Sequence, residues 1–182
     1  PFFLRRMKGD WYDQKYCLKE GTAISNDKFF LERKRTLRKT ITQLRGWQQH
    51  VINRLNQPAD ERTIIYCNLP YKSGKTSLVH YLNDTYGAVL IDGEKRHLLA
   101  QVENNKKADV FIYYQPADGG RIPWDAIESI KDGIFASHFG TKNNGMCKIE
   151  HYIHLVIFSN RKLEDNLGGY QIDKERFINI TS

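Results

Sequence analysis

The chain has 182 residues and a mass of 21.3 kDa, which fits one domain of ordinary size, or one domain with a short appendage, and excludes two large domains. With 40% hydrophobic residues and a mean hydropathy of −0.61, the composition argues against a membrane-spanning segment and against wholesale disorder. Lys and Arg number 28 against 21 Asp and Glu, and the resulting net charge of +7 favours a polyanionic partner such as nucleic acid.

Residues 1–26 start at Pro1 with an apolar run and no initiator Met, and we expect them to be the end of a domain that begins upstream. The three cysteines of the chain, Cys17, Cys67 and Cys147, are few and lack metal-ligand spacing. They predict buried thiols in a reducing compartment rather than a disulfide framework or a structural zinc site.

Residues 27–57 hold most of the positive charge. Within 28–45, seven Lys and Arg stand against one Glu, a local balance of +6, so the rest of the chain carries only +1. Apolar residues recur at intervals of three and four from Leu37 to Leu55, which predicts one or two amphipathic helices with a basic outer face. The segment is either a solvated linker helix or a helix that packs against copies of itself or contacts a DNA backbone, and periodicity does not choose between them.

Residues 58–182 begin at a boundary that Pro58 and Asp60 mark. Apolar runs and helical patterns then alternate, with strands predicted at 63–67, 88–91, 110–114 and 153–158 and helices predicted at 77–83 and 124–131. Strands that alternate with helices predict an α/β domain with a mainly parallel sheet.

The segment between the first strand and the first helix ends in Gly74-Lys75-Thr76, the second half of a phosphate-binding loop. In such loops backbone N–H groups meet the phosphates at a helix N-terminus, a Lys meets the outer phosphates and a hydroxyl holds Mg²⁺. We therefore expect ATP and Mg²⁺ as cofactors, with Thr76 on the metal and the phosphates held by Lys72, Ser73, Gly74, Lys75, Thr76 and Ser77. The pattern places its first glycine at position 69, where this chain has Leu69.

An acidic residue at the end of a neighbouring strand should hold the metal and polarise the attacking water. One candidate strand, 88–91, is followed by Asp92, whereas strand 110–114 is followed by Gln and Pro. The last predicted strand leads to Asn160, a neutral amide that suits sensing of a γ-phosphate or orientation of water, although an Asn after a strand also commonly forms a turn.

Taken together, these residues resemble the replication initiator (Rep) proteins of circular single-stranded DNA viruses, whose C-terminal half is a superfamily 3 helicase. Residues 127–133, Ile-Glu-Ser-Ile-Lys-Asp-Gly, are similar to the IE-x-IKDG segment that follows the Walker B strand in related Reps. Residues 154–160 are similar to motif C, which ends in a sensor Asn, and residues 173–177 resemble the segment that carries an arginine finger.

The resemblance implies that residues 58–182 form an AAA+-like P-loop helicase domain with a parallel sheet, located in the host nucleus. Its catalytic residues are then Lys75, Thr76 and Asn160, with Arg176 completing the site of a neighbouring subunit. An arginine finger that acts in trans implies a closed homo-oligomeric ring, a hexamer in the family, with the basic helical segment as its oligomerisation collar.

Residues 15–21, Lys-Tyr-Cys-Leu-Lys-Glu-Gly, resemble the Y-x-x-K motif of the HUH endonuclease that precedes the helicase in these proteins. The resemblance makes Tyr16 the catalytic nucleophile that attacks a DNA phosphate and Lys19 its electrostatic helper, one helical turn away. The alternative is that Tyr16 only packs. The nuclease also needs two His separated by one hydrophobic residue, and the chain has no such pair, so we expect no DNA nicking by this chain alone.

Residues 137–148 contain Asn-Asn-Gly between two short strand-like runs, which predicts a β-hairpin. In the resembling helicases such a hairpin projects into the central pore, where Lys and aromatic side chains track single-stranded DNA. The candidate DNA-binding residues are Lys142 near the tip with His138, Phe139 and Lys148 behind it. The alternative is a solvent-exposed hairpin with one stray Lys.

The helicase segment departs from the family pattern at two positions. Leu69 replaces the first loop glycine, and Tyr114 stands where alignment on Pro116 places the Walker B Asp. Asp92 follows a strand that the fold implies to lie at the sheet edge, so Asp118 is the better candidate for the metal-holding acid. We expect ATP binding with less metal support and weak or slow turnover.

Three functions fit these observations. The first is an ATP-driven helicase of a viral rolling-circle initiator, which moves as a ring on single-stranded DNA. The second is a degenerate ATPase kept as a DNA-binding oligomerisation scaffold. The third, a cellular P-loop kinase, fits Gly74-Lys75-Thr76 but leaves the hairpin, the IKDG segment and the Y-x-x-K segment unexplained.

Overall fold

The computed structural model describes residues 41–116, 120–136 and 145–181. The chain divides into two compact units, Pro1–Arg38 and Lys39–Ser182, and the second contains all of the described residues. Several residues singled out from the sequence lie outside the described ranges, and their roles stay predictions: Tyr16, Lys19, Asp118, His138, Phe139 and Lys142.

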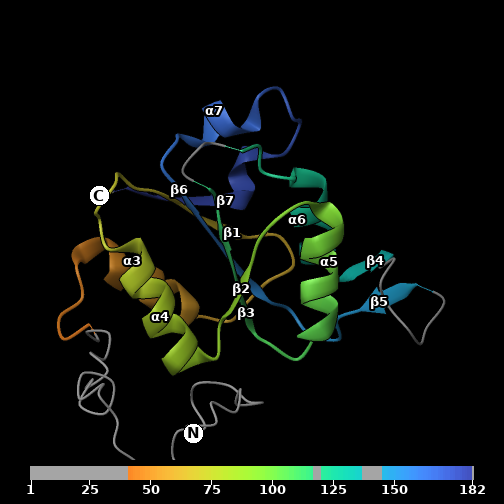
Figure 1. The fold of residues 1–182 in the computed structure, drawn as a ribbon, viewed down its shortest axis with the longest axis horizontal. Coiled ribbons are helices and arrows are strands. Elements are labelled where there is room, and N and C mark those ends of the chain that lie inside the picture. Colours follow the sequence, from red (N-terminus) through yellow and green to blue (C-terminus); the bar gives the residue numbers. More distant parts are fainter. Residues whose placement is uncertain (1–40, 117–119, 137–144, 182) are drawn as a thin grey trace, which may run out of the picture. The chain divides into compact units, whose positions relative to one another are not determined.

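The second unit is an α/β domain built on a five-stranded parallel sheet, as the sequence predicts (Figure 1). The strand order is β2-β3-β6-β1-β7, so β1 lies between β6 and β7, and β2 forms one edge. All neighbouring strands in this sheet run parallel. The strands are β1 (Ile64–Asn68), β2 (Val89–Ile91), β3 (Val110–Tyr114), β6 (His154–Ser159) and β7 (Phe177–Thr181).

Helices cover both faces of the sheet (Figure 1). Helices α3 and α4 pack on one face, and α5, α6 and α7 pack on the other. A short 3₁₀ helix, η2, leads into β7. The helices are α3 (Gly46–Leu55), α4 (Lys75–Tyr86), α5 (Lys95–Asn104), α6 (Trp124–Asp132), α7 (Leu163–Leu167) and η2 (Lys174–Arg176).

The near-continuous apolar sequences of the central strands follow from this two-sided cover. In β1, Ile64 and Tyr66 join the cluster beneath α5 and α6, whereas Ile65 and Cys67 join the cluster beneath α3 and α4. A strand buried on both faces cannot alternate apolar with polar residues, because both sets of side chains lie in a core. Four of the five strands, β1, β2, β3 and β6, therefore form from the runs that the sequence marks as strands.

The predicted strands and helices are confirmed to within a few residues, but α5, α7, η2 and β7 were missed. Helix α5 is mostly polar, and its buried residues are Leu98, Leu99 and Val102. Strand β7 has the sequence Phe-Ile-Asn-Ile-Thr, of which only Phe177 and Ile180 are buried, and this short run at the end of the chain was not marked as a strand. Both elements depend on the sheet, since α5 covers it and β7 extends it beside β1.

Helix α3 belongs to the same compact unit as the sheet. Its Trp47, Val51 and Leu55 are buried, at the helical spacing that the sequence predicts, and the Trp47 ring meets the Phe158 ring edge-on with 6.2 Å between centroids. The sequence places a domain boundary at Pro58, yet the fold continues across it. The collar role of the basic segment stays a prediction.

The predicted hairpin has two paired strands at its base, β4 (Ile134–Ala136) and β5 (Met146–Lys148). They run antiparallel, with Ile134 opposite Lys148 and Ala136 opposite Met146. The segment 137–144 that joins them lies outside the described residues. Among the described residues, no helix has the length and apolar character needed to cross a lipid bilayer.

Two of the three cysteines lie in the described part of the chain. Cys67 in β1 and Cys147 in β5 are both buried and free, as predicted. Burial raises the pKa of both thiols, so neither is a reactive thiolate near neutral pH.

Leu55→Ala tests whether α3 is part of the folded core. The Leu55 side chain is 7% exposed beneath the sheet, so we expect the substitution to lower the free energy of unfolding by about 2–5 kcal/mol. Urea denaturation followed by circular dichroism measures this change. His50→Ala, on the exposed side of the same helix, is the matched control, and equal stability of the two variants would contradict the packing.

Candidate phosphate-binding site

The site lies where two adjacent strands send the chain to opposite faces of the sheet. Strand β1 leads to α4 on one face, and its neighbour β6 leads to α7 on the other. Because these connections diverge, a crevice opens at the carboxyl ends of the two strands, which is the usual ligand position in open α/β sheets. The loop 69–74 and Asn160 follow β1 and β6 at this point.

Leu69, which stands where the loop pattern has a glycine, has a structural role in this fold. Its backbone N–H donates to the Ser159 carbonyl at 3.0 Å, which extends the contact between β1 and β6, and its side chain is fully buried beneath α3 and α4. The turn is made further along instead, where Lys72 has a φ of 62° and Gly74 a φ of 96°. Gly74 is then the residue from which α4 begins.

Lys75 is the centre of the site. Its side chain is buried, and its ammonium donates to the Leu69 carbonyl at 2.8 Å, to the Pro70 carbonyl at 2.9 Å and to Oδ1 of Asn160. Burial lowers the pKa of Lys75 below its ordinary value. The fold thus joins two residues, Lys75 and Asn160, that lie 85 positions apart in the sequence.

A cavity of about 500 Å³ lies over the start of α4. Every residue predicted to hold phosphates lines it, together with Tyr114 at the end of β3, where the resemblance expects an Asp. The lining includes three cationic side chains, and none of its described residues is acidic. The lining residues are Arg45, Tyr71, Lys72, Ser73, Gly74, Lys75, Thr76, Ser77, Tyr114 and Asn160.

The start of α4 suits an anion for two reasons. The helix begins without a side-chain cap, and the N–H groups of a first helical turn carry partial positive charge. Ser73, which also lines the cavity, is 8% exposed, and its Oγ has no hydrogen-bond partner among the described residues. A phosphate at this position would accept from these donors.

Two residues that sequence reasoning missed, Arg45 and Gln48, hold the loop from outside. Arg45 donates from Nη1 to the Ser73 carbonyl at 2.6 Å, and Gln48 donates from Nε2 to the Gly74 carbonyl at 3.3 Å. The Arg45 backbone N–H in turn donates to Oε1 of Gln48 at 2.9 Å. Gln48 precedes the buried Val51 and Leu55 by helical intervals. A polar residue on the apolar face of a helix could therefore have been recognised from the sequence as a residue with a buried hydrogen-bond partner.

The described residues do not by themselves fit a Mg²⁺ site. Thr76 supplies one hydroxyl, and the described residues contain no cluster of three or more His, Cys, Asp or Glu side chains that could hold a metal. Asp92 follows the edge strand β2, where its backbone hydrogen-bonds with Gln101. Because hard divalent cations prefer carboxylate oxygens, we derive no step through the metal from these residues.

Arg176 lies at the other end of the sheet from Lys75. It precedes β7, whose Phe177 pairs with Ile64 at the amino end of β1, whereas the loop follows the carboxyl end of β1. Its Nη1 forms an ion pair with Glu128 at 2.7 Å, and its side chain is 10% exposed. The fold therefore does not bring Arg176 to the phosphate loop of its own chain.

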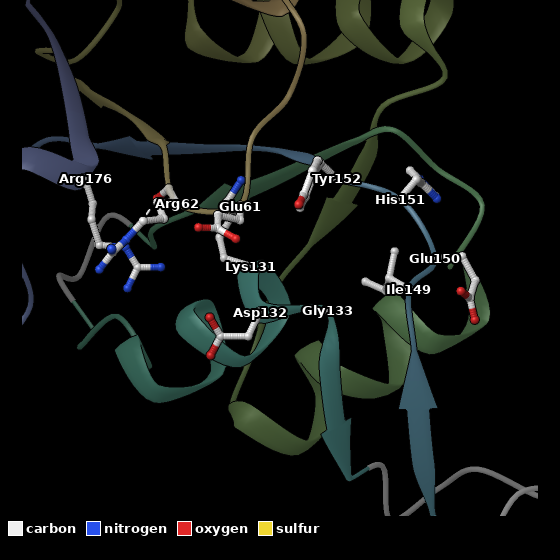
Figure 2. A pocket seen from close by; sticks show the side chains of 10 residues that line it. All are labelled: Glu61, Arg62, Lys131, Asp132, Gly133, Ile149, Glu150, His151, Tyr152 and Arg176. Carbon is white, nitrogen blue, oxygen red and sulfur yellow. Dashed lines mark hydrogen bonds between the residues drawn. The ribbon is translucent and has the colours of Figure 1, made fainter.

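A second cavity, of about 630 Å³, lies between Arg176 and the base of the hairpin (Figure 2). Lys131, from the segment similar to IKDG, lies at its inner wall and donates to the carbonyls of Asp60 at 2.6 Å and Ile153 at 2.8 Å. It thereby ties α6 to the chain before β1 and to the chain before β6. Burial lowers the pKa of Lys131 from 10.5 to about 8.

Lys148 is the one candidate DNA-binding residue in the described part of the chain. It lies in β5 at the base of the hairpin, and its exposed ammonium pairs with Glu150 at 3.1 Å. An exposed pair of this kind contributes little stability, so Lys148 can exchange Glu150 for a phosphate at small cost.

Comparisons with protein-family models, curated proteins and solved structures find no match to this chain. The functional interpretation therefore depends on the residues and geometry of the site.

The lowered pKa of Lys131 predicts a pH-dependent stability. Between pH 8 and 10.5 the unfolded chain binds this proton more tightly than the folded chain, so stability rises with pH across that window. We expect the stability of the wild type relative to Lys131→Met to rise by about 2 kcal/mol from pH 8 to 10.5. Urea denaturation at several pH values measures this difference.

Tyrosines such as Tyr66 and Tyr113, whose pKa values burial raises, also titrate at high pH, but they do so in both proteins and cancel in the difference. The Lys107→Met variant is the control, because it makes the same substitution at an exposed lysine. Parallel pH profiles for the wild type and Lys131→Met would contradict the assignment.

Proposed function

We propose that Lys39–Ser182 is a P-loop ATPase domain, the superfamily 3 helicase part of a Rep-type rolling-circle initiator. The observation that carries this proposal is the meeting of Lys75, at the start of α4, with Asn160, at the end of the adjacent strand. A cation and an amide at one crevice are the groups needed beside a terminal phosphate. A binding site for a smaller anion would not need Asn160.

Lys75 supplies the positive charge for the outer phosphates of ATP. A phosphate oxygen would replace the carbonyls of Leu69 and Pro70 as acceptor for its ammonium, while the N–H groups of the first turn of α4 and the Ser73 hydroxyl complete the cradle. Asn160, relieved of its contact with Lys75, can hydrogen-bond the attacking water or the γ-phosphate.

A degenerate ATPase that serves as a scaffold is the second candidate, and one observation favours it. The described lining of the cavity has no carboxylate, and the ring of Tyr114 fills the position where the resemblance expects one. Tyr114 is partly buried and packs against the core residue Phe158, with 6.1 Å between ring centroids. Turnover, rather than nucleotide binding, separates the two candidates.

The proposal extends to a homo-oligomeric ring, a hexamer by resemblance, that encloses single-stranded DNA. The hairpin would meet the DNA through Lys142, Lys148, Phe139 and His138. In a ring with head-to-tail interfaces, opposite sides of neighbouring subunits meet, so the distance of Arg176 from its own loop is compatible with a role in the neighbour's site. For that role the Arg176 guanidinium must exchange Glu128 for a phosphate.

Lys75→Ala tests the proposed function. We expect the wild type to bind ATP, and the variant to lose at least about tenfold in affinity, because a charge-assisted contact to phosphate is lost. Isothermal titration calorimetry measures binding, and phosphate release with and without single-stranded DNA measures turnover. DNA-stimulated turnover supports the motor, and nucleotide and DNA binding without turnover supports the scaffold.

Lys107→Ala removes the same charge from an exposed position and is the matched control. If the wild type fails to bind ATP, or if Lys75→Ala binds it as tightly as the control, the ATPase proposal is wrong.

Mixing two inactive variants tests the role of Arg176 in trans. Lys75→Ala and Arg176→Ala subunits should each lack hydrolysis, yet a mixture should recover part of it. Random mixing places an intact Arg176 beside an intact Lys75 at about a quarter of the interfaces of a ring. Phosphate release by the separate and mixed proteins is the measurement.

Arg62→Ala is the control, because it removes another cationic side chain that lines the same cavity. Full activity of Arg176→Ala alone, or a mixture as inactive as its parts, would exclude a shared site.

A further inference from the structure

Arg45 connects the basic segment of the sequence with the phosphate loop. It is the last of the seven basic residues in 28–45, and the one within the described residues. It lies immediately before α3, outside the stretch that the loop pattern covers, and its side chain lines the cavity over α4. A Cβ at Gly74 would lie 3.7 Å from its Cζ atom, so the guanidinium adjoins the residue from which α4 begins.

The Arg45 guanidinium keeps donors for a ligand. An Arg side chain has five N–H donors in a planar fork, and the structure uses one nitrogen, Nη1, for the Ser73 carbonyl. The contact of Arg45 with Ser73 and the contact of Gln48 with Gly74 hold both residues against the loop. The remaining N–H donors of Arg45 are therefore held at the edge of the cavity over α4.

The charges of the side chains that line the cavity also favour a phosphate ligand. A nucleoside triphosphate brings several negative charges, which must be neutralised where it binds. The described lining offers Arg45, Lys72 and Lys75 as cations and no carboxylate to hold a metal ion. The unpartnered, buried hydroxyl of Ser73, the residue whose carbonyl Arg45 contacts, is an independent sign that a hydrogen-bonding ligand belongs there.

We propose that Arg45 is a phosphate-binding residue of the nucleotide site, and that it supplies charge neutralisation that does not depend on a carboxylate-held metal. The inference rests on the proposed ATPase function and names the group that compensates for the missing acid.

A purely structural role is the alternative: Arg45 could do no more than hold the Ser73 carbonyl. Gln48 separates the two roles, since it holds the neighbouring Gly74 carbonyl without a charge. Arg45→Gln separates them further, because glutamine can still donate a hydrogen bond to a carbonyl but carries no charge. Only a phosphate-binding role makes the loss in affinity grow with the number of phosphates on the ligand.

The experiment measures binding of inorganic tripolyphosphate, of inorganic phosphate and of ATP to the full chain, with EDTA in place of Mg²⁺. We expect the wild type to bind tripolyphosphate under these conditions and Arg45→Gln to bind it about tenfold more weakly, with a smaller loss for phosphate. Arg45→Lys should recover part of the affinity, because the charge returns without the fork. Gln48→Ala should lose less than Arg45→Gln, and the exposed Arg96→Ala should lose nothing.

The outcomes are distinguishable from failure of the proposed function. If Lys75→Ala abolishes ATP binding while Arg45→Gln binds tripolyphosphate like the wild type, the ATPase proposal stands and Arg45 is only a clamp. If Arg45→Gln and Gln48→Ala lose equally for every ligand, the clamp interpretation likewise replaces ours. If the wild type binds none of the three ligands in EDTA, the Arg45 proposal falls, and the ATPase proposal falls with it only if the wild type also fails to bind ATP with Mg²⁺. Thermal melting of each variant confirms that folded protein is compared, and Arg45→Lys retains the test if Arg45→Gln does not fold.

Discussion

The structure depends on one topological constraint: β1 and β6 are neighbours in a parallel sheet, and the chain leaves them toward opposite faces. A sheet buried on both sides needs cover on both sides, so the connections must diverge somewhere. At that point the crevice opens, and the chain places a glycine-initiated helix and Asn160 there. The loop follows β1 and Asn160 follows β6, so the site forms only because these two strands are neighbours.

Within the crevice, Lys75 is a buried cation whose hydrogen-bond acceptors are all oxygen atoms, and its ammonium also lies 5.9 Å from the centroid of the Tyr71 ring. Its three acceptors, two loop carbonyls and the Asn160 amide, carry no formal charge, so its positive charge is not neutralised by a paired carboxylate. Burying an ammonium in this way is costly, and its pKa is lowered accordingly. An arriving anion would relieve that cost, which is why this arrangement favours phosphate over a neutral ligand.

The two ends of the sheet are joined by β6. Lys131 contacts the carbonyl of Ile153 just before this strand begins, and Asn160 contacts Lys75 just after it ends. The Arg176 cavity and the hairpin base lie at the first end (Figure 2). The phosphate site lies at the second.

The sequence by itself determined the α/β class, the positions of the central strands and the helix that begins at Gly74-Lys75-Thr76, because apolar runs and glycine geometry act locally. It also marked Asn160 from its place after a strand. Only the tertiary structure decided that α3 packs in this core, that Leu69 is buried where a glycine is expected, and that Arg45 and Gln48 hold the loop. These depend on contacts between residues that lie far apart in the chain, and no local pattern of apolar, charged or turn-forming residues specifies which strand will lie beside which.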